Sequence, residues 1–353
     1  MKIAIFLPNW IGDVVMATPT LRAVRNRYAS AELIGVMRPY VADVLAGTTW
    51  LDEKLYYDPR SQDPALKSRQ LVRQLRKRHP DTVLLLTNSL RTGLLGWLSG
   101  APQRVGYAQY GRGGLLTDKL KFPKMHGKFV PSSTMDSYLR LAYLLGCREQ
   151  HNQTELSTLP EDDDAADRAW ERLRLPAPDQ VVVCHNAGGW NGKASSKSWP
   201  AESMAELLRR IANHLNLSVL VMCGPNERAD AANIALLANH PNVKSLADQP
   251  LSIGLTKACV RRSRLMVSTD SGPRHFAAAF GVPVVSLYGP THIAWGNTHF
   301  SHEIHLQHDV PCGPCMKRVC PLKHHNCMRD LTVDRVFDAV VQQLGTQTQP
   351  NAA

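Results

Sequence analysis

Long apolar runs are missing from this sequence. No stretch approaches the roughly 18–20 apolar residues of a membrane-spanning helix, and there is no low-complexity tract. The apolar run that follows Lys2 is interrupted by Pro8, Asn9 and Asp13 before it could form the apolar core of a secretion signal. We therefore expect no transmembrane segment, a cytoplasmic location, and cysteines that are reduced, metal-bound or buried.

Acidic residues are scarce in the first part of the chain. Residues 1–150 hold 22 Lys and Arg against 11 Asp and Glu, whereas residues 151–353 hold 19 of each. The whole formal charge of +11 therefore lies in the first part. A one-sided positive field fits an anionic partner such as nucleic acid, acidic lipid headgroups or an acidic saccharide, although basic surfaces also serve solubility.

The length of 353 residues exceeds what one hydrophobic core usually supports, so we expect two domains. Apolar strand-like runs alternate with helix-like segments, which predicts an α/β fold with parallel sheets. The alternation occurs twice and gives two Rossmann-like domains that face each other across a cleft. We expect domains at 1–160 and 179–335, a linker at 161–178, a Cys-rich loop at 311–328, and a C-terminal helix and tail at 336–353.

The expected linker begins with the acidic run Asp162–Asp164. Three neighbouring carboxylates resemble a metal-binding set, but they follow no strand. We interpret them as helix N-terminal charge that complements the helix dipole.

Three turns of the second domain follow predicted parallel strands, so they share one edge of the sheet. In the first, Gly188, Gly189 and Gly192 allow close backbone approach, and Lys193 and Lys197 supply positive charge suited to a diphosphate. The order and spacing are not those of a Walker motif, and Lys197 could instead lie in solvent at a helix entry. In the second turn, Glu227 could accept hydrogen bonds from ribose hydroxyls or cap the next helix.

The third turn, STDSGPRH, is the most specific stretch. Asp270, Ser271 and Gly272 form a tight turn whose backbone N–H groups precede a helix, which is typical of a phosphate site. His275 lies one helical turn further on and could add a donor. The apolar segment that follows returns at once to a buried strand, an arrangement that a solvated loop would not need.

Asp13 is the one acid between the first strand and the next helix. It follows Gly12 and precedes the apolar residues Val14, Val15 and Met16. It could be a helix N-cap, because aspartate accepts backbone N–H bonds well. It could also be a catalytic base at the mouth of a Rossmann-type sheet.

The motifs together resemble those of glycosyltransferase family 9, the ADP-heptose:lipopolysaccharide heptosyltransferases. The resemblance rests on DSGPRH, on the following AAAFGVPVVSLYGPT, on GDVVMATP near the start and on KSWP between them. The tail PCGPCMKRVCPLKHHNCMRDLT is similar to that of many type II members.

The resemblance implies a GT-B fold, with the acceptor held by the first domain and the nucleotide sugar by the second. It implies transfer of heptose from ADP-heptose to a heptosyl-Kdo-lipid A type acceptor of the lipopolysaccharide inner core, with inversion. That acceptor is anionic, which would explain the basic first half. The enzyme could then lie peripherally at the inner face of the inner membrane.

The resemblance also implies roles for the residues at the turns. Asp13 matches the general base that takes the proton from the acceptor hydroxyl. Glu227 matches a ribose contact, and Asp270 matches the first residue of the family's D-[ST]-G turn, which binds donor sugar or shapes the loop. A single displacement needs one base. It needs no acid if positive charge stabilises the departing diphosphate, for which the candidates are Lys197, the Ser271 and Gly272 amides and His275.

On the acceptor side, Asn88 and Ser89 end a strand and Arg104 precedes another. The basic helix with Arg73, Arg76, Lys77 and Arg78 could meet phosphates, but we favour a solvated face.

Four cysteines lie close together in the sequence, with His324 and His325 among them. The set is Cys312, Cys315, Cys320 and Cys327, spaced C-x2-C-x4-C-x6-C. A structural zinc or other metal and reduced thiols in a structural loop both fit, with disulfides less favoured in the cytosol. The chemistry expected here requires no metal cofactor.

Two other functions compete with that of a heptosyltransferase, and one of them is not enzymatic. A basic, zinc-containing nucleic-acid-binding protein fits the pI of about 9.4. Against it, the basic half is separate from the cysteines and lacks interleaved aromatics for stacking, so we expect no nucleic-acid partner. A related GT-B enzyme of different donor or acceptor specificity, including an epimerase, is the nearer alternative.

Overall fold

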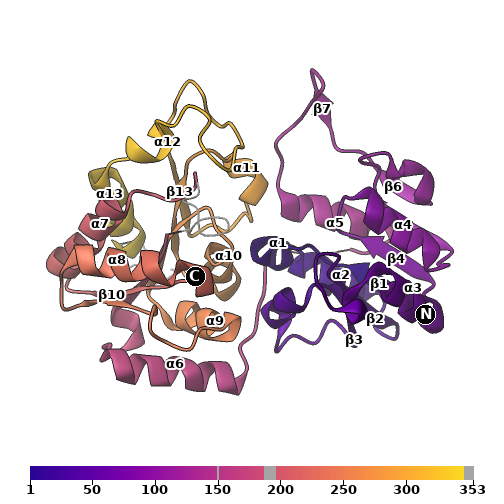
Figure 1. Ribbon diagram of the computed structural model, residues 1–353, viewed down its shortest axis with the longest axis horizontal. Helices are drawn as coiled ribbons and strands as arrows, with labels where there is room; N and C mark the ends of the chain where they lie inside the picture. Colours follow the sequence, from indigo (N-terminus) through magenta and orange to yellow (C-terminus); the bar gives the residue numbers. More distant parts are fainter. Residues whose placement is uncertain (149–150, 187–195, 346–353) are drawn as a thin grey trace, which may run out of the picture. The chain divides into compact units, whose positions relative to one another are not determined.

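In the computed structural model, residues 1–148, 151–186 and 196–345 are described. The chain divides into two compact units, each built around its own parallel sheet (Figure 1). Unit 1 comprises Met1–Ser157 with Asn297–His299, and unit 2 comprises Thr158–Gly296 with Phe300–Ala353. The prediction of an α/β fold with two Rossmann-like parallel sheets is confirmed.

Unit 1 has a six-stranded sheet in the order β3-β2-β1-β4-β5-β6, which is the Rossmann order. Its strands are β1 (Lys2–Phe6), β2 (Glu32–Met37), β3 (Glu53–Tyr56), β4 (Thr82–Leu85), β5 (Gln103–Tyr107) and β6 (Asp118–Leu120). The α-helices are α1 (Ile11–Met16), α2 (Thr18–Arg27), α3 (Ser68–Arg78), α4 (Leu90–Leu98) and α5 (Thr134–Leu144). Short 3-10 helices are η1 (Pro39–Leu45), η2 (Pro64–Leu66) and η3 (Arg112–Leu115).

Burial on both faces explains why the central strands of unit 1 are apolar throughout. On one face, Ala4 and Phe6 of β1 join a core cluster with Leu71 and Leu75 of α3. Ile3 and Ile5 point the other way and are also fully buried. The alternating side chains of one strand therefore require helices on both faces of the sheet.

A small hairpin projects from unit 1, formed by β7 (Lys124–Met125) and β8 (Lys128–Phe129) (Figure 1). At its base Phe122 stacks on Tyr107 with ring centroids 3.9 Å apart, and Phe129 meets Phe122 edge-on. Aromatic contacts thus anchor a segment that is otherwise exposed.

Unit 2 repeats the Rossmann order as β11-β10-β9-β12-β13-β14. Its strands are β9 (Val181–His185), β10 (Ser218–Val221), β11 (Val243–Ser245), β12 (Leu265–Thr269), β13 (Val284–Tyr288) and β14 (Glu303–Gln307). The α-helices are α6 (Pro160–Leu173), α7 (Ala201–Leu215), α8 (Arg228–Ala238), α9 (Ile253–Arg262), α10 (Arg274–Phe280), α11 (Ile293–Gly296), α12 (Asn326–Arg329) and α13 (Val333–Gly345). Short 3-10 helices are η4 (Pro178–Gln180) and η5 (Pro225–Glu227).

The segment 161–178, which we expected to be a linker, is instead part of unit 2. Most of it forms helix α6, whose first turn holds Glu161, Asp162 and Asp163, as the interpretation of the acidic run required. Asp163 and Asp167 pair with Arg261 and Arg262 on α9, and the Arg262 guanidinium lies over Trp170 of α6. These contacts explain why the unit boundary lies at Ser157, before the helix.

The C-terminal helix could not be assigned to either domain from the sequence. The structure packs α13 within unit 2, where Asp334 pairs with Arg210 of α7 over 2.5 Å and Gln343 donates to the backbone of His302.

Candidate active site

The site in unit 2 is built at the carboxyl ends of β9 and β12, the point at which the strand order reverses. In open α/β sheets, ligands bind at this crevice. β9 ends in His185, β12 is followed by Asp270, Ser271 and Gly272, and β10 is followed by Glu227 in η5. The second and third turns share this edge of the sheet, and Lys197 of the first turn contacts Asp270 there. Residues 188–193 of the first turn lie outside the described residues.

His185 joins two of these turns and was not identified from the sequence. Its Nδ1 lies 2.9 Å from Ser271 Oγ and its Nε2 lies 3.2 Å from Glu227 Oε2. The imidazole is buried. It therefore fixes the two side chains at the crevice. Its position as the last residue of a buried strand was the signal that could have identified it.

Of the two interpretations offered for Glu227, the structure shows the capping one. Its Oε2 accepts the backbone N–H of Gly224 over 2.7 Å, which closes the turn before α8. The same oxygen meets His185, and the side chain stays about one-fifth exposed, at 21%. It thus caps its own turn and still presents a carboxylate at the crevice.

Asp270 and Lys197 form the charged centre of the unit 2 site. Lys197 Nζ donates to Asp270 Oδ2 over 2.7 Å, and Thr291 Oγ1 donates to the same oxygen over 2.7 Å. The buried Arg274 faces Oδ1 at 3.5 Å. Burial alone would raise the pKa of Asp270, but the charges of Lys197 and Arg274 overcome it and hold that pKa well below its ordinary value. Asp270 is therefore a carboxylate at neutral pH.

His275 lies on α10, one turn beyond Gly272, and is almost fully buried. Burial, reinforced by the charge of Arg274, holds the pKa of His275 well below its ordinary value, so the imidazole is neutral at neutral pH. Among the described residues, its Nδ1 has no hydrogen-bond partner. His275 is therefore available as a neutral donor or acceptor rather than as a positive charge.

Asp13 lies in unit 1, and the structure corrects its local environment. The helix α1 begins at Ile11 with Trp10 as its N-cap, so Asp13 is in the first helical turn and is not the N-cap. An acid there complements the helix dipole. Asp13 is partly exposed. Its negative charge adds to burial in raising the pKa of both Tyr138 and Tyr40, which shows that both phenols lie near it.

Unit 1 also contains a hollow of about 290 Å³ at the carboxyl ends of its strands, here called the unit 1 hollow. Its polar lining includes three arginines, Arg38 after β2, Arg60 after β3 and Arg91 at the start of α4. Arg38 Nε is buried and has no hydrogen-bond partner in the described part of the chain. Three guanidinium groups around one hollow favour an anionic ligand. None of the three was singled out from the sequence.

The predicted acceptor residues divide into two groups. Ser89 lines the unit 1 hollow and caps α4 by accepting from Thr92 N over 3.1 Å. Asn88 is its neighbour, and its Oδ1 accepts from the buried Arg112 over 3.1 Å. Arg104 lies elsewhere, because it is the second residue of β5 and pairs with Val83 near the amino ends of the strands. Its guanidinium donates to the backbone of Leu115 and Ala101, so we withdraw Arg104 from the site.

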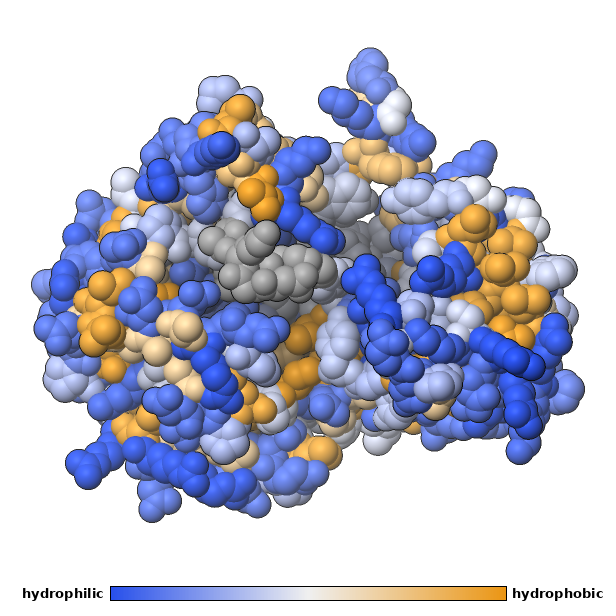
Figure 2. All heavy atoms as spheres, viewed as in Figure 1, coloured by the Kyte–Doolittle hydropathy of each residue, from blue (hydrophilic) through white to orange (hydrophobic). Residues whose placement is uncertain are grey.

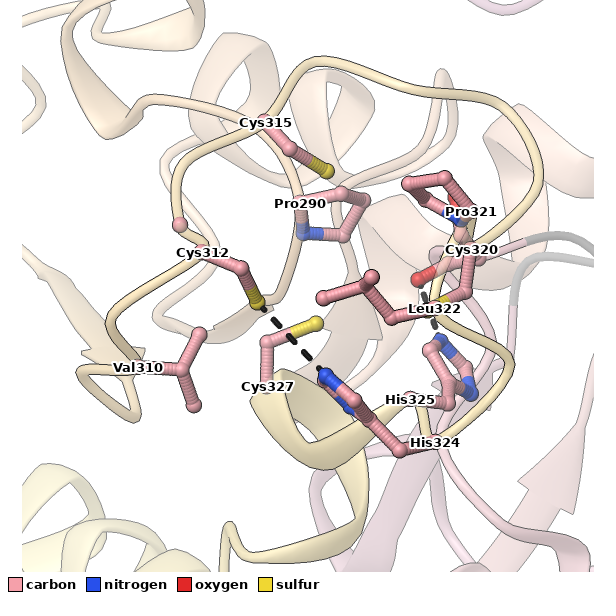
Figure 3. A pocket seen from close by; sticks show the side chains of 12 residues that line it. Pro290, Val310, Cys312, Cys315, Cys320, Pro321, Leu322, His324, His325 and Cys327 are labelled. Carbon is pink, nitrogen blue, oxygen red and sulfur yellow. Dashed lines mark hydrogen bonds between the residues drawn. The ribbon is translucent and has the colours of Figure 1, made fainter.

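The four clustered cysteines lie in the Cys-rich loop of unit 2 and carry free thiols. All four, with His324 and His325, line one small cavity of about 40 Å³. Figure 3 shows the side chains of Cys312, Cys315 and Cys327 directed towards the middle of the loop. Cys312 Sγ lies 3.8 Å from His324 Nε2. As the side chains stand, no three His, Cys, Asp or Glu of the described residues are close enough together to hold a metal ion.

Comparison with known proteins identifies the family of the chain. The model of glycosyltransferase family 9 (heptosyltransferase) matches residues 68–326. Lipooligosaccharide heptosyltransferase 2 of Campylobacter jejuni is 24% identical, with 96% of this chain and 97% of the relative covered.

Two solved structures share the fold over nearly their whole length. The Escherichia coli ADP-heptose lps heptosyltransferase II superposes with a TM-score of 0.78 at 19% identity, covering 99% of this chain and all of the other. The Escherichia coli heptosyltransferase WaaC with ADP-2-deoxy-2-fluoro heptose gives 0.71 at 16% identity, covering 97% and 99%. The family match spans most of the chain, and the protein therefore belongs to glycosyltransferase family 9, the heptosyltransferases.

Proposed function

We propose that this glycosyltransferase moves heptose from ADP-heptose to an anionic acceptor of the lipopolysaccharide inner core, with inversion at the anomeric carbon. The names of the relatives support a lipopolysaccharide or lipooligosaccharide acceptor. The structure of WaaC with an ADP-fluoroheptose supports the donor. The observation that carries the proposal is the set of charged and polar groups at the switch point of unit 2.

The donor diphosphate is assigned to the Lys197–Asp270 centre. Lys197 supplies a partly exposed ammonium group, the Ser271 and Gly272 backbone N–H groups follow Asp270, and the neutral His275 adds a ring nitrogen. Glu227, held by His185, is assigned to the ribose hydroxyls. Positive charge and fixed donors stabilise the departing ADP, so no acid group is required. No metal ion is required for this step.

The acceptor is assigned to the unit 1 hollow. Arg38, Arg60 and Arg91 line it, and Kdo carboxylates or core phosphates suit guanidinium groups, which bind such oxygens in pairs. The basic excess of residues 1–150 adds a general attraction. Asn88 stays a candidate through its neighbour Ser89, which lines the hollow.

The reaction is a single displacement with Asp13 as general base. Asp13 takes the proton from the acceptor hydroxyl as that oxygen forms a bond to the anomeric carbon. The bond between the anomeric carbon and the diphosphate oxygen breaks at the same time, and ADP carries away the electron pair. One base is enough, and the configuration inverts because the bond forms on the face opposite to the leaving group.

We propose a peripheral position at an anionic membrane surface, and the exposed surface of unit 1 supports it. No helix among the described residues is long and apolar enough to span a membrane. Figure 2 shows hydrophobic side chains gathered over α4, where Leu90, Leu94 and Trp97 are 52%, 43% and 52% exposed. Their i, i+4, i+7 spacing puts them on one helix face. A large exposed apolar face of this kind marks an interaction site.

The hairpin of unit 1 is a second exposed region that combines apolar and basic side chains. It presents exposed Met125 and Phe129 among lysines 119, 121, 124 and 128, all exposed. Basic residues beside apolar ones suit anionic lipid headgroups. We propose that α4 and this hairpin contact the cytoplasmic leaflet of the membrane, which carries the lipid-linked acceptor.

The proposed function is tested by product analysis. Purified enzyme is incubated with ADP-heptose and a heptosyl-Kdo-lipid A acceptor, and the product is analysed by mass spectrometry. The proposal predicts the mass gain of one heptose, with release of ADP, and no gain with a UDP-hexose donor. Turnover of the sugar nucleotide without acceptor would instead support an epimerase-like activity.

A further inference from the structure

The Cys-rich loop is tied to the two segments that hold Asp270. One tie involves Ser196, the residue before Lys197. Its backbone N–H donates to Arg318 O over 3.1 Å, and its hydroxyl donates to Lys317 O over 2.6 Å. Its own carbonyl oxygen accepts from His325 Nε2 over 2.6 Å.

A second tie involves the residues on either side of Thr291. Met316 N donates to Pro290 O over 2.8 Å, and His292 N lies 3.4 Å from Met316 Sδ. The side chains of Thr291 and Lys197 each donate to Asp270 Oδ2 over 2.7 Å. The loop therefore fixes the neighbours of both donors to Asp270.

Apart from these ties, only Cys327 and Met328 of the loop are buried. Cys312, Cys315 and Cys320 are partly exposed, and Met316, Val319 and Leu322 are 51%, 67% and 59% exposed. An exposed loop with this little apolar burial needs a cross-link to keep one conformation. Four free thiols and two imidazoles around one cavity of about 40 Å³ provide ligands for such a cross-link.

We propose that Cys312, Cys315, Cys320 and Cys327 bind one divalent transition-metal ion, zinc or iron, which locks the loop as a brace for the Lys197–Asp270 centre. Four thiolates satisfy the tetrahedral preference of both ions. Because the thiols are not yet in contact, the ion draws them together as it binds, and each thiol releases its proton to solvent. The same loop carries three positively charged residues, Lys317, Arg318 and Lys323.

Metal content is the first measurement. Protein purified without chelator is analysed for zinc and iron by plasma mass spectrometry, and protein stripped by a chelator under reducing, anaerobic conditions is reloaded with Zn²⁺ or Fe²⁺. We expect about one ion per chain in both cases. The variants Cys315→Ser and Cys312→Ser should lose most of the bound metal. Val319→Ser, an exposed change in the same loop, should keep it. Wild-type protein that neither holds nor takes up a stoichiometric ion would overturn the proposal.

ADP binding tests the brace, and this part rests on the proposed function. We expect calorimetry to give roughly tenfold weaker ADP binding for stripped protein, because Lys197 loses its fixed position. Reloading should restore affinity in the wild type but not in Cys315→Ser. Circular dichroism confirms that the variants are folded. A bound metal whose removal leaves ADP affinity unchanged would overturn the brace. Loaded wild-type protein that binds no ADP would count against the proposed function, while the metal content would stand as measured.

Discussion

Lys197 donates from Nζ to both Oδ2 and the backbone oxygen of Asp270, over 2.7 and 3.1 Å. The lysine side chain is 38% exposed and the carboxylate 15%. Lys197 is therefore positioned by an acid before any ligand arrives. The Lys197 ammonium group stays accessible from solvent, so it could bind a diphosphate while it remains paired with Asp270.

Removing the charge of Asp270 should change how stability depends on pH. Its pKa lies well below the ordinary value of about 3.9. A depressed pKa stabilises the fold above the unfolded-state value, and this contribution is lost as the pH falls through the folded-state value. The free energy of unfolding of the wild type should fall below about pH 4, and that of Asp270→Asn should fall less. At pH 7 the variant should be about 1–3 kcal/mol less stable.

Urea denaturation between pH 7 and pH 3 measures this difference. Asp179→Asn, an exposed change in unit 2, is the matched control and should follow the wild type. Equal pH dependence in Asp270→Asn and the wild type would show that this carboxylate is not held in its charged form by the fold.

Replacing His185 should weaken nucleotide binding. The change His185→Ala removes the ring that joins Ser271 to Glu227, so both side chains lose a fixed orientation. We expect calorimetry to give about tenfold weaker ADP binding with the fold retained. His240→Ala, at the opposite, amino-terminal edge of the sheet, should bind ADP as the wild type does. Unchanged ADP affinity in His185→Ala would show that the contacts of His185 with Ser271 and Glu227 do not contribute to nucleotide binding.

The unit 1 hollow should determine acceptor binding. The buried Arg38 Nε has no hydrogen-bond partner in the described part of the chain. A bound anion would satisfy this donor. We expect Arg38→Gln to raise the KM for the acceptor roughly tenfold or more, because charge-assisted hydrogen bonds are lost. The affinity for ADP should not change. Arg73→Gln, on the exposed face of α3, is the control. Equal acceptor KM values would place the acceptor elsewhere.

Vesicle flotation tests the membrane surface of unit 1. The double change Leu94→Ser and Trp97→Ser should reduce binding to phosphatidylglycerol vesicles about tenfold or more, since buried apolar area drives insertion. Leu236→Ser with Leu237→Ser removes two exposed leucines from α8 of unit 2 and should have no effect. Wild-type binding that is absent, or equal for neutral and anionic vesicles, would contradict the assignment.

The central strands were predictable from the sequence, and the edge strands were not. β1, β4, β9 and β12 are buried on both faces and are read directly as apolar runs. Strands β3, β6, β11 and β14 lie at the edges of the two large sheets. They are short or only partly buried, so their side chains carry little periodic signal.

The positions of residues relative to the strand ends explain which site residues could be predicted from the sequence. Lys197, Glu227 and the 270–272 turn follow strand ends, and parallel topology brings them to one edge. His185 was missed because it is the last residue of an apolar strand rather than part of a turn. Arg104 was misplaced because its strand begins at residue 103, which puts it at the amino edge. Arg38, Arg60 and Arg91 line one hollow, but this could not be predicted because it depends on the order of the strands in the sheet.

Acceptor-dependent release of ADP from ADP-heptose, compared between the wild type and Asp13→Asn, tests the central claim most directly. Asp13→Asn should keep its fold and its ADP affinity but lose roughly 10²–10⁴-fold in rate, as expected for removal of a general base. Asp43→Asn, at an exposed acid of the same unit, should turn over normally. ADP release that requires the acceptor and vanishes in Asp13→Asn is the predicted result. Near-normal turnover by that variant would contradict the mechanism.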